Sequence, residues 1–448
     1  MPTPAPATCF ATLGVHGVQS VQILDASVQL IALRAGRARP YARTVRTALL
    51  IGALALAACE QESASSDPPV DAAAVDAARP DAAPTDAAPP DAAPGPHVVD
   101  RLEYFSWIDI PDGRSEPIAI KLPDDVLSLT LVLQGEDDFS FYVVGRLEGP
   151  DGQVLVAEGP PEVEPTARDR VSSVFAGPFI SPNRSVSASF KVSSMLAPNN
   201  PGVSVGPGTW HFRVLAADGN RQPVTSRAQM TALVKRGPAP QVQGTLDLHL
   251  HFTGAHGWTA ANGPDDPELQ RAIDRMRRFY DGVGIALGEI TYEDISGEFR
   301  TVDSGELLIS SLQRMFALGR HDTGVSLFFV ERINSAFGDS VVAGIAGGTP
   351  GPTLHAGTNR SGVAVATSLD PHPDSIGHVM AHETGHYLGL FHTIEVTGAV
   401  DQIDDTAEGR DGDDNLMFPT VTREEAHFSD GQGWVLHRNA SVVAVEAP

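Results

Sequence analysis

Three histidines and one glutamate near the C-terminus have the residue types and spacing of a metal site. His382 and His386 are four residues apart, Glu383 follows the first, and His392 comes six residues after the second. On a helix, His382 and His386 lie one above the other, so both imidazoles can reach one ion at about 2.0 Å. Glu383 then lies beside that ion without binding it, where it can act as a general base.

A glycine, Gly389, stands between the second and third histidines. It allows the chain to leave the helix through the left-handed region and turn back, which brings His392 to the same ion as a third ligand. The chain has two cysteines, Cys9 and Cys59, so an all-cysteine zinc site is excluded. Any metal must therefore use histidine and carboxylate ligands.

Of the remaining histidines, we consider four as ligands, and none of them is assigned to the metal. His378 lies one turn before His382, shares its helix face and is too far along the helix to be a ligand, although it can support one. His249, His251 and His256 have no partner at ligand spacing, and we predict that they lie on the surface or in turns.

The elements that position these residues follow from the periodicity of the C-terminal half. The stretch 374–390 is a predicted helix with Asp374 or Ser375 as its N-cap, and an acid followed by proline at Asp266 and Pro267 predicts the start of another. A third helix is predicted over 304–317, and strands are predicted over 245–252, 285–292, 325–330 and 362–367. This alternation indicates a mixed α/β (α+β) domain over residues 244–448.

The complete string His-Glu-x-x-His-x-x-Gly-x-x-His resembles the zinc motif of the metzincin peptidases. The resemblance implies that His382, His386 and His392 bind Zn²⁺ and leave a fourth position for water. It also implies that Glu383 is the catalytic base for attack of that water on a peptide bond.

Two further segments resemble the same family. Met417, 25 residues after His392, resembles the methionine of the turn that lies beneath the metal. The Gly- and Pro-rich stretch 341–352 resembles the edge strand that pairs with an extended substrate.

An acidic loop follows the third histidine, and its segment 401–406 resembles the corresponding segment of pappalysin-like metzincins, although the cysteines of that subfamily's loop are missing. Its carboxylates either bind Ca²⁺ or are simply solvated, and their irregular spacing leaves both interpretations open. The calcium candidates are Asp401, Asp404 and Asp405.

Residues 97–243 contain short alternating runs separated by Gly, Pro and Asp turns, with no helical stretch between them. Strands are predicted over 102–110, 117–122, 127–134, 140–147, 154–158, 186–192, 210–215 and 228–234. About eight strands at this spacing predict an all-β sandwich, jelly-roll-like in form. The fold class expected for the whole chain is therefore multidomain, with this sandwich followed by a metzincin-like zinc peptidase domain.

The N-terminal segments predict export. An arginine-rich stretch precedes the apolar run 48–58, which is too short to span a bilayer and ends before Cys59 in a sequence that resembles the lipobox of bacterial lipoproteins. We therefore predict a signal region over 1–58, a lipid on Cys59, and an Asp/Ala/Pro-rich linker over 59–96. A plain secretory signal is the alternative, and in either case the mature chain lies outside the cytoplasm. The lipid anchor would place it in the bacterial cell envelope, at the outer membrane or cell surface, from which it could be released.

The net charge of the chain limits the kinds of partner that it can bind. The chain of 448 residues has 31 Lys and Arg against 56 Asp and Glu, a net charge of −25, which argues against nucleic acid and against contact with a membrane other than through a lipid anchor. The function we expect is a zinc-dependent endopeptidase acting on a protein or peptide. The alternative is a cell-surface binding lipoprotein whose zinc domain is catalytically inert.

Overall fold

The computed structural model describes residues 97–157, 171–173, 177–179, 183–184, 189–219, 222–238, 241–305, 310–335, 341–395, 400–407, 414–420 and 425–445. The predicted export region, Cys59 and the linker lie outside these ranges. All described residues fall in one compact unit. None of the helices found within those ranges is both long and apolar enough to cross a membrane.

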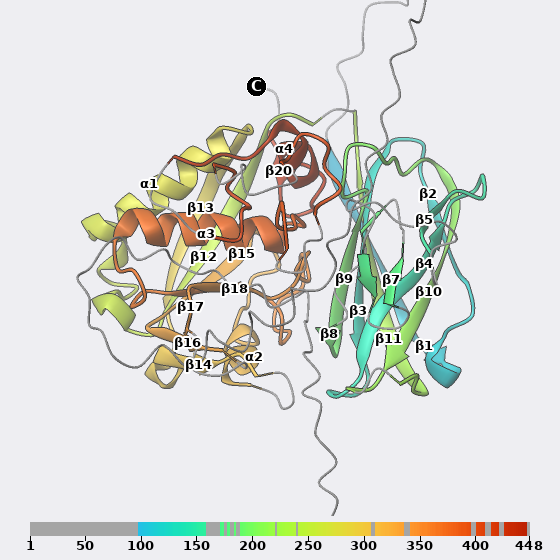
Figure 1. Cartoon of the computed structure of the whole chain (residues 1–448), viewed down its shortest axis with the longest axis horizontal. Coiled ribbons are helices and arrows are strands. Elements are labelled where there is room, and N and C mark those ends of the chain that lie inside the picture. The colour runs from blue at the N-terminus through green and yellow to red at the C-terminus, as the bar shows by residue number, and fades with distance from the viewer. Residues whose placement is uncertain are drawn as a thin grey trace, which may run out of the picture. The chain divides into compact units, whose positions relative to one another are not determined.

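Two antiparallel sheets form the N-terminal part, as Figure 1 shows. One has the strand order β1-β11-β3-β9 and the other β2-β10-β4-β5, with β8 beside β4. The strands are β1 (Val98–Ile110), β2 (Ile118–Leu122), β3 (Val126–Gly135), β4 (Phe141–Glu148), β5 (Val154–Val156), β8 (Ser189–Phe190), β9 (Val192–Ala197), β10 (Gly208–Ala217) and β11 (Ser226–Arg236); β6 (Val171–Ser173) and β7 (Gly177–Phe179) pair separately. Strands β1 to β4 alternate between the two sheets, which is a jelly-roll connection.

The alternation of side chains explains this sandwich. In β10, Trp210, Phe212 and Val214 point inward and are at most 1% exposed, while their neighbours point outward. The predicted strand over 186–192 is interrupted where the structure describes it, because Lys191 has a φ of 64° and separates β8 from β9, while residues 186–188 lie outside the described residues. All of β9 is buried, so it lacks the alternation that would have revealed it.

The C-terminal part is built on one mixed sheet with the order β13-β12-β15-β19-β18, in which β18 is antiparallel to β19 and the other neighbours are parallel. Its strands are β12 (Gly244–Phe252), β13 (Ile285–Asp294), β15 (Val325–Val330), β18 (Gly344–Ala346) and β19 (Val363–Ala366), and β20 (Val443–Ala444) pairs with β12. A small sheet contains β14 (Thr301–Asp303), β16 (Arg332–Asn334) and β17 (Val341–Val342). The predicted edge strand is confirmed at β18, the last strand in this order.

Both faces of the mixed sheet are covered. Alternate residues of β15 point into different clusters: Leu327 and Phe329 face the core that holds α1 (Pro267–Asp281), α3 (Pro373–Tyr387) and α4 (Asp430–Leu436). Phe328 and Val330 face a second core with α2 (Ser311–Phe316). Figure 1 shows α1 and α3 side by side over the sheet.

This covering overturns two predictions about histidines. His249 and His251 were expected on the surface or in turns, but both are buried in β12, on the face opposite to Leu248 and Leu250. A two-sided sheet buries both alternating sets of residues, so polar residues at alternate positions did not mark a solvent face. His256 does lie in a short 3-10 turn.

Helix boundaries also differ from prediction. The helix expected over 304–317 is found as α2, which begins at Ser311, where Ser310 is the N-cap and forms a capping box with Gln313. Residues 306–309 of that prediction lie outside the described residues. The helix expected over 374–390 spans Pro373–Tyr387 instead, with His372 as its N-cap. The first helix agrees with prediction, since Asp266 accepts hydrogen bonds from the backbone N–H groups that follow it.

The sandwich is joined to the C-terminal part by buried polar contacts. The ammonium of Lys235 in β11 donates to the carbonyls of His437, Asn439 and Val442 at 2.6, 3.0 and 2.6 Å. Ser128 in β3 donates to the carbonyl of Arg438 at 2.6 Å. The sheet β1-β11-β3-β9 therefore lies against the C-terminal part of the chain.

Candidate metal centre

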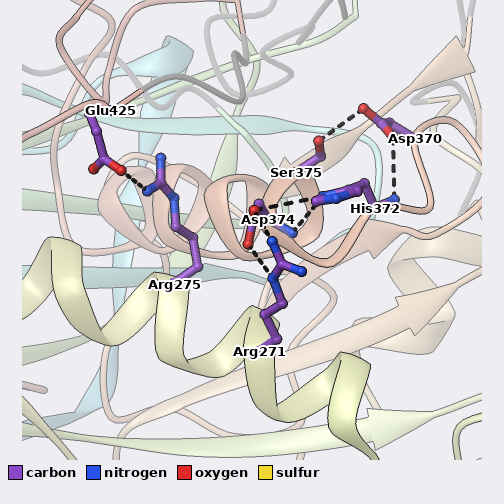
Figure 2. Close-up of polar contacts among 7 residues, drawn as sticks. All are labelled: Arg271, Arg275, Asp370, His372, Asp374, Ser375 and Glu425. Carbon is purple, nitrogen blue, oxygen red and sulfur yellow. Dashed lines mark hydrogen bonds and ion pairs between the residues drawn. The ribbon is translucent and has the colours of Figure 1, made fainter.

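The helix α3 is fixed at its N-terminal end before it reaches the site. Arg271 of α1 holds Asp374 with two contacts of 2.9 and 2.6 Å. Ser375 donates to Asp370 at 2.9 Å, and the His372 ring accepts from the backbone N–H of Asp374. Figure 2 shows these contacts around the first turn of α3, which anchor that turn to α1 and to the loop before it.

Three imidazoles converge at the other end of α3. The Nε2 atoms of His386 and His382 are 2.9 Å apart, and those of His382 and His392 are 3.3 Å apart. Nitrogens at about 2.0 Å from one tetrahedral ion are separated by roughly 3.3 Å, so these distances fit a shared zinc ion. Among the described residues, this is the one group of His, Cys, Asp or Glu whose ligand atoms lie close enough to hold a metal.

Hydrogen bonds of the opposite ring nitrogens determine which nitrogen carries the proton. Nδ1 of His382 lies 2.7 Å from the carbonyl oxygen of Leu416, and Nδ1 of His386 lies 2.6 Å from that of Leu390. A carbonyl only accepts, so both Nδ1 atoms carry the hydrogen. Their Nε2 atoms then bear lone pairs that cannot hydrogen-bond to one another, and a shared cation accounts for their close approach.

The third histidine is held by a carboxylate. Nδ1 of His392 donates to Oε2 of Glu395 at 3.0 Å, which again leaves Nε2 as the unprotonated nitrogen. Burial would raise the pKa of Glu395, but His392 and Arg184 together hold it below its ordinary value. The ring is thereby oriented by an ionised neighbour.

The environment keeps the α3 imidazoles neutral. His382 and His386 are at most 1% exposed. Burial first, and then the neighbouring histidines, lower the pKa of both rings well below the ordinary value. Neutral imidazole is the form that binds a metal.

Glu383 lies beside the triad and is fully buried. The backbone of Ala346 in β18 faces its carboxylate, but neither oxygen makes a well-formed hydrogen bond with any described residue. Burial raises the pKa of Glu383 well above its ordinary value. A buried carboxyl with no strong partner is available to exchange a proton with a reacting molecule.

The turn after α3 agrees with its prediction. Gly389 has a φ of 115°, which a residue with a side chain rarely adopts. The N–H of Leu390 donates to the carbonyl of Gly385 at 2.9 Å, so the chain folds back over the last turn of the helix. This reversal brings His392 to the two histidines of α3.

The predicted methionine turn lies beneath the triad. Met417 is fully buried, and a Cβ on Gly385 would come 2.7 Å from its sulfur. The N–H of Met417 donates to the side chain of Asn415, which also exchanges two hydrogen bonds with Gln432 of α4. Glycine at 385 therefore gives the methionine room to reach the helix.

The calcium candidates are used for local structure. Asp401 is 2% exposed and accepts from Thr406 at 2.5 Å. Asp405 accepts from Ser429 and from the N–H of Gly431, at the start of α4. These two carboxylates and that of Asp404 do not converge on a common point. Nothing in the described residues supports Ca²⁺, and the rest of the acidic loop over 408–413 lies outside them.

Some site residues were not predicted from the sequence. Glu395 could have been found, because it follows His392 by three residues and can reach its ring. Arg184 could not, since only the fold brings it to the site, and Gly344 was predicted only as part of the edge stretch 341–352. His378 is 2% exposed and meets the Phe279 ring edge-on, and it is not among the converging ligands.

No protein-family model matches the chain, and no curated protein matches it. Among solved structures it is similar to metalloproteinase-II from Bacteroides fragilis, with 18% identity and a TM-score of 0.28 over 46% of this chain and 54% of that one. It is also similar to the infectious bursal disease virus VP2 subviral particle, with 11% identity and a TM-score of 0.18 over 31% and 32%. A family two carbohydrate esterase from Cellvibrio japonicus follows, with 8% identity and a TM-score of 0.15 over 44% and 53%.

The chain thus spans about half or less of the length of these structures, and TM-scores this low do not define a shared fold.

Proposed function

We propose that this chain is a zinc-dependent endopeptidase of the metzincin kind, nearest to the pappalysin-like subfamily. The observation that carries the proposal is the convergence of three Nε2 lone pairs beside the buried carboxylate of Glu383. Structural zinc sites use four protein ligands, mostly with cysteine, whereas catalytic sites use three and keep one position open. Three imidazoles and a free carboxylate fit the second description.

His382, His386 and His392 would hold the zinc ion. When bound, zinc supplies Lewis acidity, which lowers the pKa of water and polarises a carbonyl. Glu383 takes a proton from the attacking water and returns it to the leaving amine, which breaks the peptide bond.

The strand β18 supports a peptide as the substrate class. It pairs with β19 along one edge and is the last strand in the order of the mixed sheet. Its residue Gly344 lies against Glu383, so a peptide added along this strand would pass the reacting carboxylate. Extended peptides bind to sheet edges in this way through main-chain hydrogen bonds.

We also propose that the mature chain is a lipoprotein of the bacterial cell envelope, attached through Cys59. Labelling with a radioactive fatty acid tests this. The wild-type chain is expected to take up label and Cys59→Ser to take up none, while label retained by Cys59→Ser would contradict the anchor.

A cleavage assay tests the enzymatic proposal. The purified chain is incubated with casein and with a peptide library, with and without a metal chelator, and its zinc content is measured. We expect about one zinc per chain, and cleavage that the chelator abolishes and added zinc restores. Zinc binding without any cleavage would instead favour a binding protein with an inert metal site.

A further inference from the structure

We infer that Arg184, a residue of the N-terminal sandwich, is a positioning residue for His392, so that the sandwich forms part of the metal centre. The inference rests on the proposed zinc function, because it assigns Arg184 to that same site. It gives the sandwich a task within the catalytic centre in place of a separate binding function.

A short series of contacts links Arg184 to the third ligand. Its Nη2 lies 3.4 Å from Oε1 of Glu395, and the other oxygen of that carboxylate accepts the Nδ1–H of His392 at 3.0 Å. The guanidinium also stacks over the ring of Phe391, with 3.9 Å to the ring centroid. Arg184 thus contacts both the residue before His392 and the group that orients its ring.

The burial of these groups makes the ion pair effective. The side chain of Arg184 is 6% exposed and that of Glu395 is 17% exposed. Water screens such a pair much less than a surface pair, and a buried carboxylate without a countercharge is strongly disfavoured. Arg184 therefore stabilises Glu395 in the position where it faces His392.

The backbone around Arg184 is fixed within the sandwich. Asn199 accepts from the N–H of Arg184 at 3.0 Å and donates to its carbonyl at 2.5 Å. Asn183 accepts from the N–H of Asn199 at 2.9 Å and donates to the carbonyl of Leu196 at 3.0 Å. Both asparagines are buried, so the guanidinium is presented from a preorganised support.

A second sandwich residue touches the same turn. Leu196 of β9 is fully buried and belongs to the core of α1 and α3. A Cβ on Gly389 would come 3.0 Å from its Cδ2. The turn that delivers His392 is therefore covered by Leu196 and held by Arg184, and both come from the sandwich.

The zinc dissociation constant of the purified full chain tests the inference, measured by competition with a chromophoric chelator. Outer partners of metal-bound histidines typically contribute about 10- to 100-fold in metal affinity. We expect Arg184→Met and Arg184→Gln to weaken zinc binding by about 10-fold, Glu395→Gln to weaken it at least as much, and Arg184→Lys to recover part of the loss. Both Arg184→Met and Arg184→Gln are made, so that if one of them does not fold, the other still tests the inference.

The double variant separates positioning from a general stabilising contact. If Arg184 acts through Glu395, Arg184→Met combined with Glu395→Gln binds zinc no more weakly than Glu395→Gln alone. Arg146→Met is the matched control, since Arg146 pairs with Glu148 on the sandwich surface, and it should bind zinc as the wild type does.

Two results would overturn the inference while leaving the proposed function intact: wild-type zinc affinity in a folded neutral variant of Arg184, or losses that multiply in the double variant. A wild-type chain that binds no zinc would overturn both.

Discussion

The backbone of Gly344 lies directly against the side chain of Glu383. A Cβ on Gly344 would come 2.5 Å from Cγ of Glu383 and 2.7 Å from Cγ1 of Val379, which is closer than a Cβ comes to a non-bonded carbon. The edge strand β18 therefore approaches α3 as closely as glycine allows, and a side chain at this position would displace the carboxylate.

Gly344→Ala is expected to displace Glu383 without disturbing the histidines. A shift of about 1 Å in a catalytic group costs on the order of 100-fold in rate, so kcat should fall by about that factor while the zinc dissociation constant stays unchanged. Gly206→Ala is the control, since a Cβ there meets nothing within 4 Å. Equal kcat values in the two variants would show that the contact does not position Glu383.

His392, the last residue of the motif, and His378, which precedes the motif, should behave differently. His392→Ala removes a predicted ligand and should weaken zinc binding by several orders of magnitude. His378→Ala removes a buried ring that is not among the converging ligands, so its zinc binding should stay close to that of the wild type. Zinc per chain after dialysis against a mild chelator measures this. Comparable zinc loss in both variants would contradict the assignment of His392.

Much of the metal centre was predictable because it is local. The spacing of His382 and His386, the turn at Gly389 and the start of α1 at Asp266 depend on neighbours in sequence. Arg184 is brought to the site by the tertiary fold, and no local pattern reveals it.

The main errors in the predictions from sequence also arise where the tertiary fold, and not the local sequence, determines the structure. Strand β9 and the histidines of β12 are buried on two sides, so the alternation that marks a half-exposed strand is absent or misleading there. The boundaries of α3 also depend on contacts outside the helix, since its N-terminal turn is fixed by Arg271.

Lys235 should contribute strongly to stability. Its buried ammonium donates to three carbonyls, two at 2.6 Å and one at 3.0 Å. Lys235→Met leaves these acceptors without the donor and should lower the free energy of unfolding by about 3 kcal/mol. Urea titration at pH 6 measures this change, with Lys191→Met as the control, because the side chain of Lys191 is 30% exposed. A change no larger than in the control would refute the prediction.

His251 should make the fold sensitive to acid. Burial, the largest effect, lowers its pKa to about 4 despite the nearby carboxylate of Glu293. Between about pH 6.5 and pH 4, the His251 ring is therefore protonated in the unfolded state and neutral in the folded state. The neutral, buried His251 therefore makes its full contribution to the free energy of unfolding above about pH 6.5. As the pH falls toward 4, this contribution, on the order of 3 kcal/mol, is lost.

Urea unfolding of wild type and His251→Leu from pH 7 to 4.5, both with chelator, isolates this effect. Glu293, His321 and His249 lie near this position in both proteins, so the difference in slope between the two pH profiles reports the removal of His251. The wild type should lose stability more steeply. Parallel pH profiles would contradict the shifted pKa.

Substitution of Glu383 tests the proposed catalysis most directly. In Glu383→Ala and the closer-shaped Glu383→Gln, the three histidines remain, so zinc content should match the wild type. Chelator-sensitive cleavage should fall by about 100- to 10,000-fold, the usual contribution of a general base. Undiminished chelator-sensitive cleavage by a zinc-loaded Glu383 variant would contradict the proposed function.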